Sequence, residues 1–478
     1  MNAGFFETDI TPPVGMEKPG GYWKAYCPVR HDPCKVRAGV FDDGQCKVAL
    51  VGIDTCVIAA DTVAKARSLI ETYSDLVGAN VMIGASHTHC GGPLFGPSED
   101  DLVGAPELIR DLALNHSTVR DPLYEEWAVR QITTAVVEAN RRCDPVTLSI
   151  GTGQEDAAVF NRRLRMKSGR TCSHPGKGNP DIVDYAGPID PDVGVVAAWR
   201  PDGSLAGCVV NYTCHGTTGP GGISADWIYY LDTTIAGAMG GRPVTVFLNG
   251  ACGDVTQVNN LCRTERESGE KYARLIGGRV GSEAVKVMLL AERGDLGPVA
   301  AKTRILQIQR RPPSPASVVR SREIVEATTP AGAPSPEWIF AKERVVLDYM
   351  IRVEPVVDVE IQAIQIGPAV FLSNPAEYFC SMGLDIKAQS PFPFTYVVEL
   401  ANGGVGYVPN DEAFEKTGGG YETALTTYSN LVTDAGQQIV DASVALAKEL
   451  APGAEAQRPT VPPVTAVWGY GASGPDLD

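Results

Sequence analysis

Long apolar runs are absent from this sequence of 478 residues. No segment approaches the about 18 consecutive apolar residues that a membrane-spanning helix needs. Residues 1–9 also lack the basic segment followed by an apolar stretch that marks a secretion signal. We therefore expect a cytoplasmic protein without a transmembrane segment.

Basic residues are scarce relative to acidic ones. The sequence has 41 Lys and Arg against 57 Asp and Glu, which gives a formal net charge of −16. Nucleic acids and anionic membrane surfaces repel such a chain at long range. The composition argues against both partners and favours a small-molecule substrate, and it leaves homo-oligomerisation open.

Paired cysteine motifs are missing too. The twelve cysteines include no Cys-x-x-Cys pair, so neither a zinc ribbon nor a thioredoxin-like site is indicated. They are scattered singly, and several, such as Cys56 and Cys208, lie in apolar contexts. This usage is typical of free thiols in a reducing compartment.

Alternating strand and helix patterns predict a large α/β protein. The chain exceeds the about 100 to 200 residues of a usual domain, and no internal repeat is visible in it. Apolar runs at 48–53 and 81–85 flank an amphipathic helix at 59–73, which is the pattern of a β-α-β unit.

Four segments rich in Pro and Gly lead to further expectations. We expect loops over residues 1–39, a long insertion without regular structure at 167–192, and an extended, packed tail after residue 452. Prolines between residues 311 and 336 indicate a subdomain boundary.

Histidine is rare, and two of the six histidines lie close together in Ser86-His87-Thr88-His89. They follow the apolar strand predicted at 81–85, and side chains at i and i+2 of an extended segment point the same way. Gly91 and Gly92 then leave room for a ligand. By itself this pair fits a metal site and a hydrogen-bonded histidine pair equally well.

Two further strand ends carry residues that bind metals. His215 follows the strand predicted at 206–212, and Glu377 follows the strand predicted at 369–373. Nitrogen and carboxylate donors with one open coordination position are the ligand set of a catalytic zinc. The shared placement at strand ends favours the metal site over separate structural roles.

Four motifs resemble the neutral/alkaline non-lysosomal ceramidases, which are zinc-dependent amidases that cleave the N-acyl bond of ceramide. The resemblance runs in order from about residue 5 to about residue 450. The motifs are Asp9-Ile10-Thr11-Pro12-Pro13, Ala85-Ser86-His87-Thr88-His89-Cys90-Gly91-Gly92-Pro93, Asn249-Gly250-Ala251-Cys252-Gly253-Asp254-Val255-Thr256 and Asn374-Pro375-Ala376-Glu377.

The resemblance implies a fold and a domain division. The fold is α/β, with mixed β-sheets and flanking helices around a central zinc site and without a C-terminal Ig-like domain. The catalytic domain is expected at 1–455, with a subdomain boundary near 311–336, and a Pro/Gly-rich tail is expected at 456–478.

The resemblance also implies the site residues. One Zn²⁺ per chain is expected on His87, His215, Glu377 and Tyr407. The expected catalytic residues are His89, Tyr421, Arg162 and Thr256, of which Arg162 and Tyr421 also bind the substrate. Thr256 stands where the family usually has a serine.

Without the resemblance, three of these residues have ordinary structural alternatives. Tyr407 and Tyr421 fit half-buried aromatic positions, and Arg162 lies close to Arg163 and Arg165, which fits a surface ion pair.

The main hypothesis is a zinc-dependent hydrolase that cleaves an amide (N-acyl) bond with metal-activated water. A first alternative is a lactone or ester hydrolase acting on a soluble polar substrate such as a sugar acid. A second alternative is a metal-binding protein that has lost catalysis, which the change at Thr256 suggests.

Overall fold

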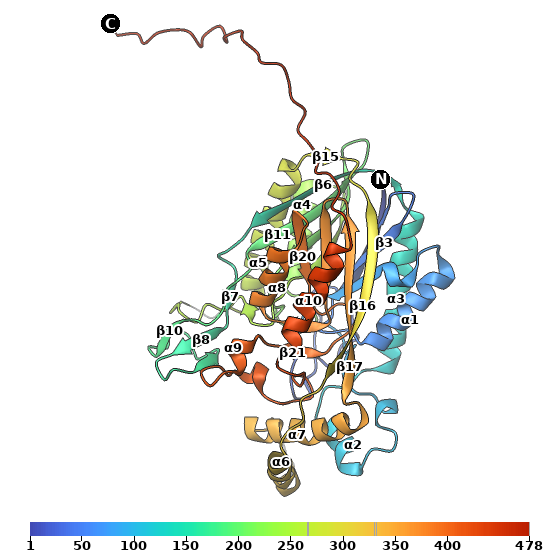
Figure 1. The fold of residues 1–478 in the computed structure, drawn as a ribbon, viewed down its shortest axis with the longest axis vertical. Coiled ribbons are helices and arrows are strands. Elements are labelled where there is room, and N and C mark those ends of the chain that lie inside the picture. The colour runs from blue at the N-terminus through green and yellow to red at the C-terminus, as the bar shows by residue number, and fades with distance from the viewer. Residues whose placement is uncertain (265–266, 329, 331, 478) are drawn as a thin grey trace.

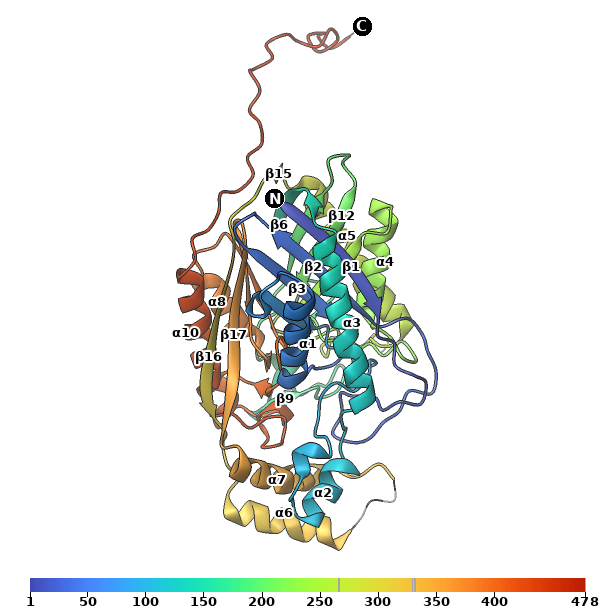
Figure 2. The same ribbon diagram turned by 90° about the vertical axis from the view of Figure 1, so that its right-hand side faces the viewer.

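Three β-sheets form the body of the protein, and their inner faces meet in one central core (Figures 1 and 2). The computed structural model describes residues 1–264, 267–328, 330 and 332–477. Leu50, Val196 and Phe371 represent the three sheets in this core, and each is essentially buried. Helices cover the outer face of every sheet. The mixed α/β fold predicted from the sequence is confirmed.

The first sheet has the strand order β4-β3-β2-β1-β5 and carries α1 and α3 on its outer face (Figure 2). Along β2 the side chains of Val36, Ala38 and Val40 pack under these helices, whereas Phe41 faces the central core. The alternation follows from the two-residue period of a strand. The first sheet and its helices comprise β1 (Asn2–Asp9), β2 (Lys35–Asp42), β3 (Lys47–Ile53), α1 (Ala60–Tyr73), β4 (Val81–Ala85), α3 (Pro122–Arg141) and β5 (Asp144–Pro145).

The second sheet has the order β13-β12-β11-β6-β15 and is covered by α4 and α5. Gly277 lets the two helices approach closely, since a Cβ atom there would lie 2.2 Å from the carbonyl oxygen of Trp227. Its elements are β6 (Thr147–Gln154), β11 (Asp192–Trp199), β12 (Leu205–Tyr212), α4 (Trp227–Met239), β13 (Val244–Asn249), α5 (Glu270–Leu290) and β15 (Arg293–Gly294).

The third sheet has the order β16-β17-β18-β20 and packs against α8 and α10 (Figure 1). Its elements are β16 (Val299–Gln309), β17 (Val356–Ile366), β18 (Ala369–Ser373), α8 (Cys380–Gln389), β20 (Phe394–Val398) and α10 (Ala435–Lys448).

The same strand topology therefore occurs three times. In each sheet three antiparallel strands precede a helix that leads to a fourth strand, which is parallel to the third: β3-α1-β4, β12-α4-β13 and β18-α8-β20. No repeat is visible in the sequence, because this topology requires only alternating apolar residues and not particular side chains.

The carboxyl ends of these parallel pairs meet at one place. Thr88, after β4, forms a bridge with Gly216, after β12. The backbone amide of Glu399, after β20, donates to the carbonyl of Asn249 at the end of β13, at 3.0 Å. Ligand sites of open α/β sheets lie beyond such strand ends.

The expectation of loops over residues 1–39 is wrong at both ends, because β1 and β2 are paired along their whole length. Residues 10–34 between them are irregular apart from short bridges. The Pro and Gly residues of this stretch therefore mark one long connection and not the whole N-terminal region.

The expectation of an unstructured insertion at 167–192 is also wrong. β9 (Thr171–Ser173) and β10 (Ile182–Tyr185) flank β8 (Arg163–Met166) in a small antiparallel sheet. The stretch 311–336 leads into a pair of helices, α6 (Pro315–Ala327) and α7 (Pro336–Val353), in which Pro315 and Pro336 take the first helical position. Its other prolines lie before α6 or between the two helices.

The remaining elements are short, and the last residues leave the body. They are η1 (Gly78–Asn80), η2 (Asp100–Leu102), α2 (Glu107–Leu114), β7 (Phe160–Asn161), β14 (Val255–Thr256), β19 (Ala376–Tyr378), β21 (Gly406–Val408), α9 (Asp411–Phe414) and η3 (Tyr421–Thr423). The tail is extended as expected, and its first residues pack on the body, since Ala456 lies against the central core and Arg458 pairs with Glu292 at 2.6 Å. The later residues do not pack, since Val464 is 85% and Trp468 75% exposed (Figure 1). Among the described residues, no helix has the length and apolarity to cross a membrane.

Candidate metal centre

His87, His215 and Glu377 come together from the three sheets. Oε2 of Glu377 lies 3.4 Å from Nε2 of His87 and 3.2 Å from Nε2 of His215. The three side chains are nearly completely buried. Together they form a group whose ligand atoms could hold one metal ion.

The surroundings of His87 leave Nε2 free for a metal. Nδ1 of His87 lies 2.9 Å from the carbonyl oxygen of Cys56, to which it donates a hydrogen bond in the corresponding tautomer. The residue follows β4 with φ +62°, a left-handed backbone conformation that turns the ring out of the strand direction. Metal-binding histidines commonly donate the other ring nitrogen to a carbonyl in this way.

The charges of the group are strongly coupled. Burial disfavours the charged form of His87, but Glu377 outweighs this effect and raises the pKa of His87. The same contact, with that to His215, overcomes burial and holds the pKa of Glu377 well below its usual range. Burial and the nearby Arg162 lower the pKa of His215 to about 3. A carboxylate and a neutral imidazole are the forms that bind metals, and Glu377 and His215 are in these forms, whereas His87 must release a proton when a metal binds.

The residues fit a tetrahedral metal ion. Zinc bonds to N and O donors measure about 2.0–2.2 Å, so two ligand atoms of a tetrahedral site lie about 3.3–3.5 Å apart. The separations of 3.2 and 3.4 Å agree with that spacing. Oε2 of Glu377 is also buried without a hydrogen-bond partner among the described residues.

Tyr407, Tyr421 and Arg162 lie beside this group. Tyr407 is directly opposite Glu377 in the parallel ladder between β19 and β21. Its hydroxyl lies 3.1 Å from the hydroxyl of Tyr421 and accepts a hydrogen bond from Arg162 at 3.1 Å. Nη1 of Arg162 also lies 3.1 Å from Nε2 of His215. The structure therefore brings all three residues to the centre.

His89 lies next to His87, with 3.3 Å between the two Nε2 atoms. Burial and the neighbouring His87 and His215 lower the pKa of His89 well below its usual value. The backbone of Gly20 covers the ring, because a Cβ atom at Gly20 would lie 2.2 Å from Nδ1 of His89.

Thr256 is buried, and its hydroxyl takes part in the local structure of its own loop. The Oγ1 atom accepts a hydrogen bond from the backbone amide of Val258 at 3.2 Å. β14, which contains Thr256, pairs with β7 and so fixes the backbone just before Arg162.

Arg162 forms a buried ion pair and not a surface one. Nε of Arg162 lies 3.0 Å from Oε1 of Glu422, and Glu422 is fully buried. By contrast, Arg165 pairs with Glu412 at the surface. Because of this pair and the two tyrosines, Arg162 keeps a raised pKa despite burial, which alone would lower it.

Two acidic residues near the centre were not recognised in the sequence. Glu422 follows Tyr421 directly, and this neighbour was the only available signal. Glu399 accepts hydrogen bonds from the backbone amides of Cys252 and Tyr378, each at 2.9 Å, and burial raises its pKa to about 8. It ties the loop after β13 to the strand that carries Glu377.

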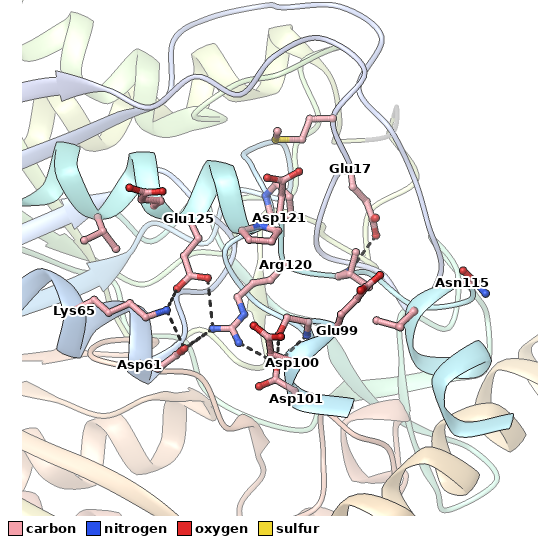
Figure 3. A pocket seen from close by; sticks show the side chains of 18 of the residues that line it. Glu17, Asp61, Lys65, Glu99, Asp100, Asp101, Asn115, Arg120, Asp121 and Glu125 are labelled. Carbon is pink, nitrogen blue, oxygen red and sulfur yellow. Dashed lines mark hydrogen bonds and ion pairs between the residues drawn. The ribbon is translucent and has the colours of Figure 1, made fainter. Parts of the chain in front are cut away.

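The structure also has a cavity of about 1340 Å³ near the starts of α1 and α3, lined by none of the residues of the candidate centre (Figure 3). Its two basic residues pair with acidic residues of the same lining: Arg120 binds Asp61 at 2.6 Å, and Lys65 binds Glu125 at 2.6 Å. The cavity is therefore separate from the metal centre.

Fold and centre together define a mixed α/β protein with a buried group of nitrogen and carboxylate donors at converging strand ends. No family model and no curated protein matches the sequence. Among solved structures, a ceramidase complexed with C2 superposes with a TM-score of 0.68 at 19% identity, covering 97% of this chain and 77% of that chain.

The neutral ceramidase from Pseudomonas aeruginosa gives a TM-score of 0.68 at 21% identity, covering 96% of this chain and 76% of that chain. The protein therefore has a ceramidase-like fold, as its motifs predict.

Proposed function

We propose that this protein is a zinc-dependent hydrolase that cleaves amide (N-acyl) bonds. The observation that carries the proposal is the convergence of three donor atoms: Oε2 of Glu377 has no hydrogen-bond partner among the described residues and lies 3.4 Å from Nε2 of His87 and 3.2 Å from Nε2 of His215. The ceramidase-like fold supports the same reaction class.

His87, His215 and Glu377 would hold the ion, and Tyr407 as the fourth protein ligand would make it five-coordinate together with the reacting water. Two nitrogens, a carboxylate and a phenol oxygen make zinc the preferred metal. When bound, zinc lowers the pKa of water to about 7 and so provides a nucleophile at neutral pH.

The neighbouring residues would stabilise negative charge and transfer protons. Arg162 keeps its charge in a buried position and so stabilises negative charge on the substrate carbonyl oxygen. Neutral His89 can accept a proton at Nε2 and pass it to the leaving amine, and Tyr421 can donate a hydrogen bond to the substrate. Thr256 shapes the loop before the centre through its bond to Val258.

We propose residues 1–455 as the catalytic unit and 456–478 as a tail that is dispensable for the reaction. A cytoplasmic location fits the twelve cysteines, all of which are free.

The test has two parts. Elemental analysis of the purified protein should give about one zinc per chain, and a His87→Ala/His215→Ala double variant should lose it. The parent should then hydrolyse amides faster than the matching esters and lactones, corrected for their intrinsic reactivity.

A His89→Ala variant should keep its zinc and lose at least about 100-fold in kcat. Absence of zinc even after reconstitution would reduce the histidines to structural residues. Turnover of esters or lactones alone would assign the other bond class.

A further inference from the structure

A hairpin-shaped loop at residues 15–27, here called the flap, covers the candidate centre. Its two arms are joined by backbone hydrogen bonds from Gly15 to Cys27 at 2.8 Å and from Lys18 to Ala25 at 2.7 Å. At its tip Gly20 lies against the ring of His89. The flap is therefore the part of the chain that a substrate next to His89 must contact.

Helix α7 fixes the flap from the other side. The ammonium group of Lys342, which is completely buried, donates to the carbonyl of Tyr22 and to the hydroxyl of Ser117, each at 2.7 Å. It also pairs with Glu343 at 2.8 Å. Because the tip is held in place, side chains on the flap have defined positions relative to the centre.

Lys18 is the unusual residue of the flap. It is half-buried, and no carboxylate lies within ion-pair distance of its ammonium group among the residues that the structure describes. Lys24, on the opposite arm, pairs with Glu17 at 2.8 Å. The two lysines of the flap thus differ in one respect: only Lys18 lacks a counter-ion.

The charge of Lys18 acts beneath the flap. Burial dominates the pKa values of Cys90 and Cys27 and raises both, and the ammonium group of Lys18 acts in the opposite direction on each. Cys90 directly follows His89 in the chain, so the charge acts on the side of the flap that faces the centre. Removing an ammonium group from water costs free energy unless an anion joins it.

We propose that Lys18 binds a carboxylate of the substrate, so that the preferred substrates are anionic amides such as N-acyl amino acids. The inference rests on the proposed amide hydrolysis and adds the substrate class. A positive charge next to the substrate carboxylate is needed for this preference, because the chain as a whole has a net charge of −16 and repels anions at long range.

The experiment compares matched substrates that differ only in charge. N-acetylleucine is paired with neutral N-acetylleucinamide, and an N-succinyl amine with the N-butyryl amine. For at least one pair the zinc-loaded protein should favour the anion about 10- to 100-fold in kcat/KM, as expected for a hydrogen bond between charged groups. Because N-acetylleucinamide contains two amide bonds, only hydrolysis of its N-acetyl bond is counted.

Variants of the two lysines separate a binding role from a structural one. Lys18→Gln should raise KM for the anion to that of the neutral analogue, and Lys18→Arg should restore part of the preference. Lys24→Gln, the matched control, should keep the preference.

The outcomes distinguish the two proposals. Hydrolysis of neither member of any pair contradicts the proposed function itself. Equal hydrolysis of both members, or a preference that survives Lys18→Gln, overturns the role of Lys18 alone and leaves amide hydrolysis standing.

Discussion

Arg162 and Arg165 are three residues apart, yet their environments differ completely. Arg162 pairs with Glu422 in the interior, where both side chains are at most 4% exposed, and Arg165 pairs with Glu412 at the surface, where both are about half exposed. A buried charge that loses its partner is left without compensation, whereas a surface charge is compensated by water.

Glu422→Gln should therefore destabilise the protein by about 3–5 kcal/mol. The control Glu412→Gln should cost less than about 1 kcal/mol. Free energies of unfolding from urea titrations would measure both, and equal losses would contradict the buried pair.

The residues of the centre were recognisable in the sequence by their residue types and their positions after apolar strands. The distances between them were not predictable. His87 and His89 were recognisable because an apolar strand ends just before them, and Arg162 was chosen over its neighbours only through the family motif. The partnership of Arg162 with Glu422 spans 260 residues of sequence, and no local pattern encodes such a contact.

At the scale of the elements, the contact between α4 and α5 is one that the sequence does not predict. The pattern of residues 267–291 predicts a long helix, and α5 occupies Glu270–Leu290. Within it Gly277 faces the backbone of α4, but Gly278 has open space around its Cβ position. Two adjacent glycines in one helix therefore have opposite roles.

Gly277→Ala should destabilise the protein by about 1–3 kcal/mol, because the added methyl group pushes the two helices apart. Gly278→Ala should stabilise it by about 0.4–1 kcal/mol, because alanine restricts the unfolded chain and suits a helix. Thermal and urea unfolding of both variants would check these signs. Effects of the same sign would show that the contact with α4 does not govern Gly277.

At the scale of the whole molecule, the candidate centre joins three sheets that have the same topology. His87 follows the first sheet, His215 follows the second, and Glu377 follows the third. A metal ion bound to all three would cross-link them and would be lost on unfolding.

Removal of the metal should therefore lower the Tm of the whole protein in one cooperative transition. A metal present at about 100 times its Kd contributes about 2.7 kcal/mol to stability. Calorimetry with and without a chelator, followed by re-addition of zinc, would measure the effect. Glu377→Gln should respond much less to the chelator, and an equal response would place the metal elsewhere.

The sequence by itself determined the α/β class and most strands and helices of the three sheets, because these depend on local apolar patterns of period 2 and 3.6. It also determined which residue types stand at the strand ends. Only the tertiary structure decided that β1 lies inside a sheet, that the topology occurs three times, and that Gly20 lies against the ring of His89. The physical reason is that these features depend on contacts between distant parts of the chain, whose free energy comes from shared burial and is not encoded in any local segment.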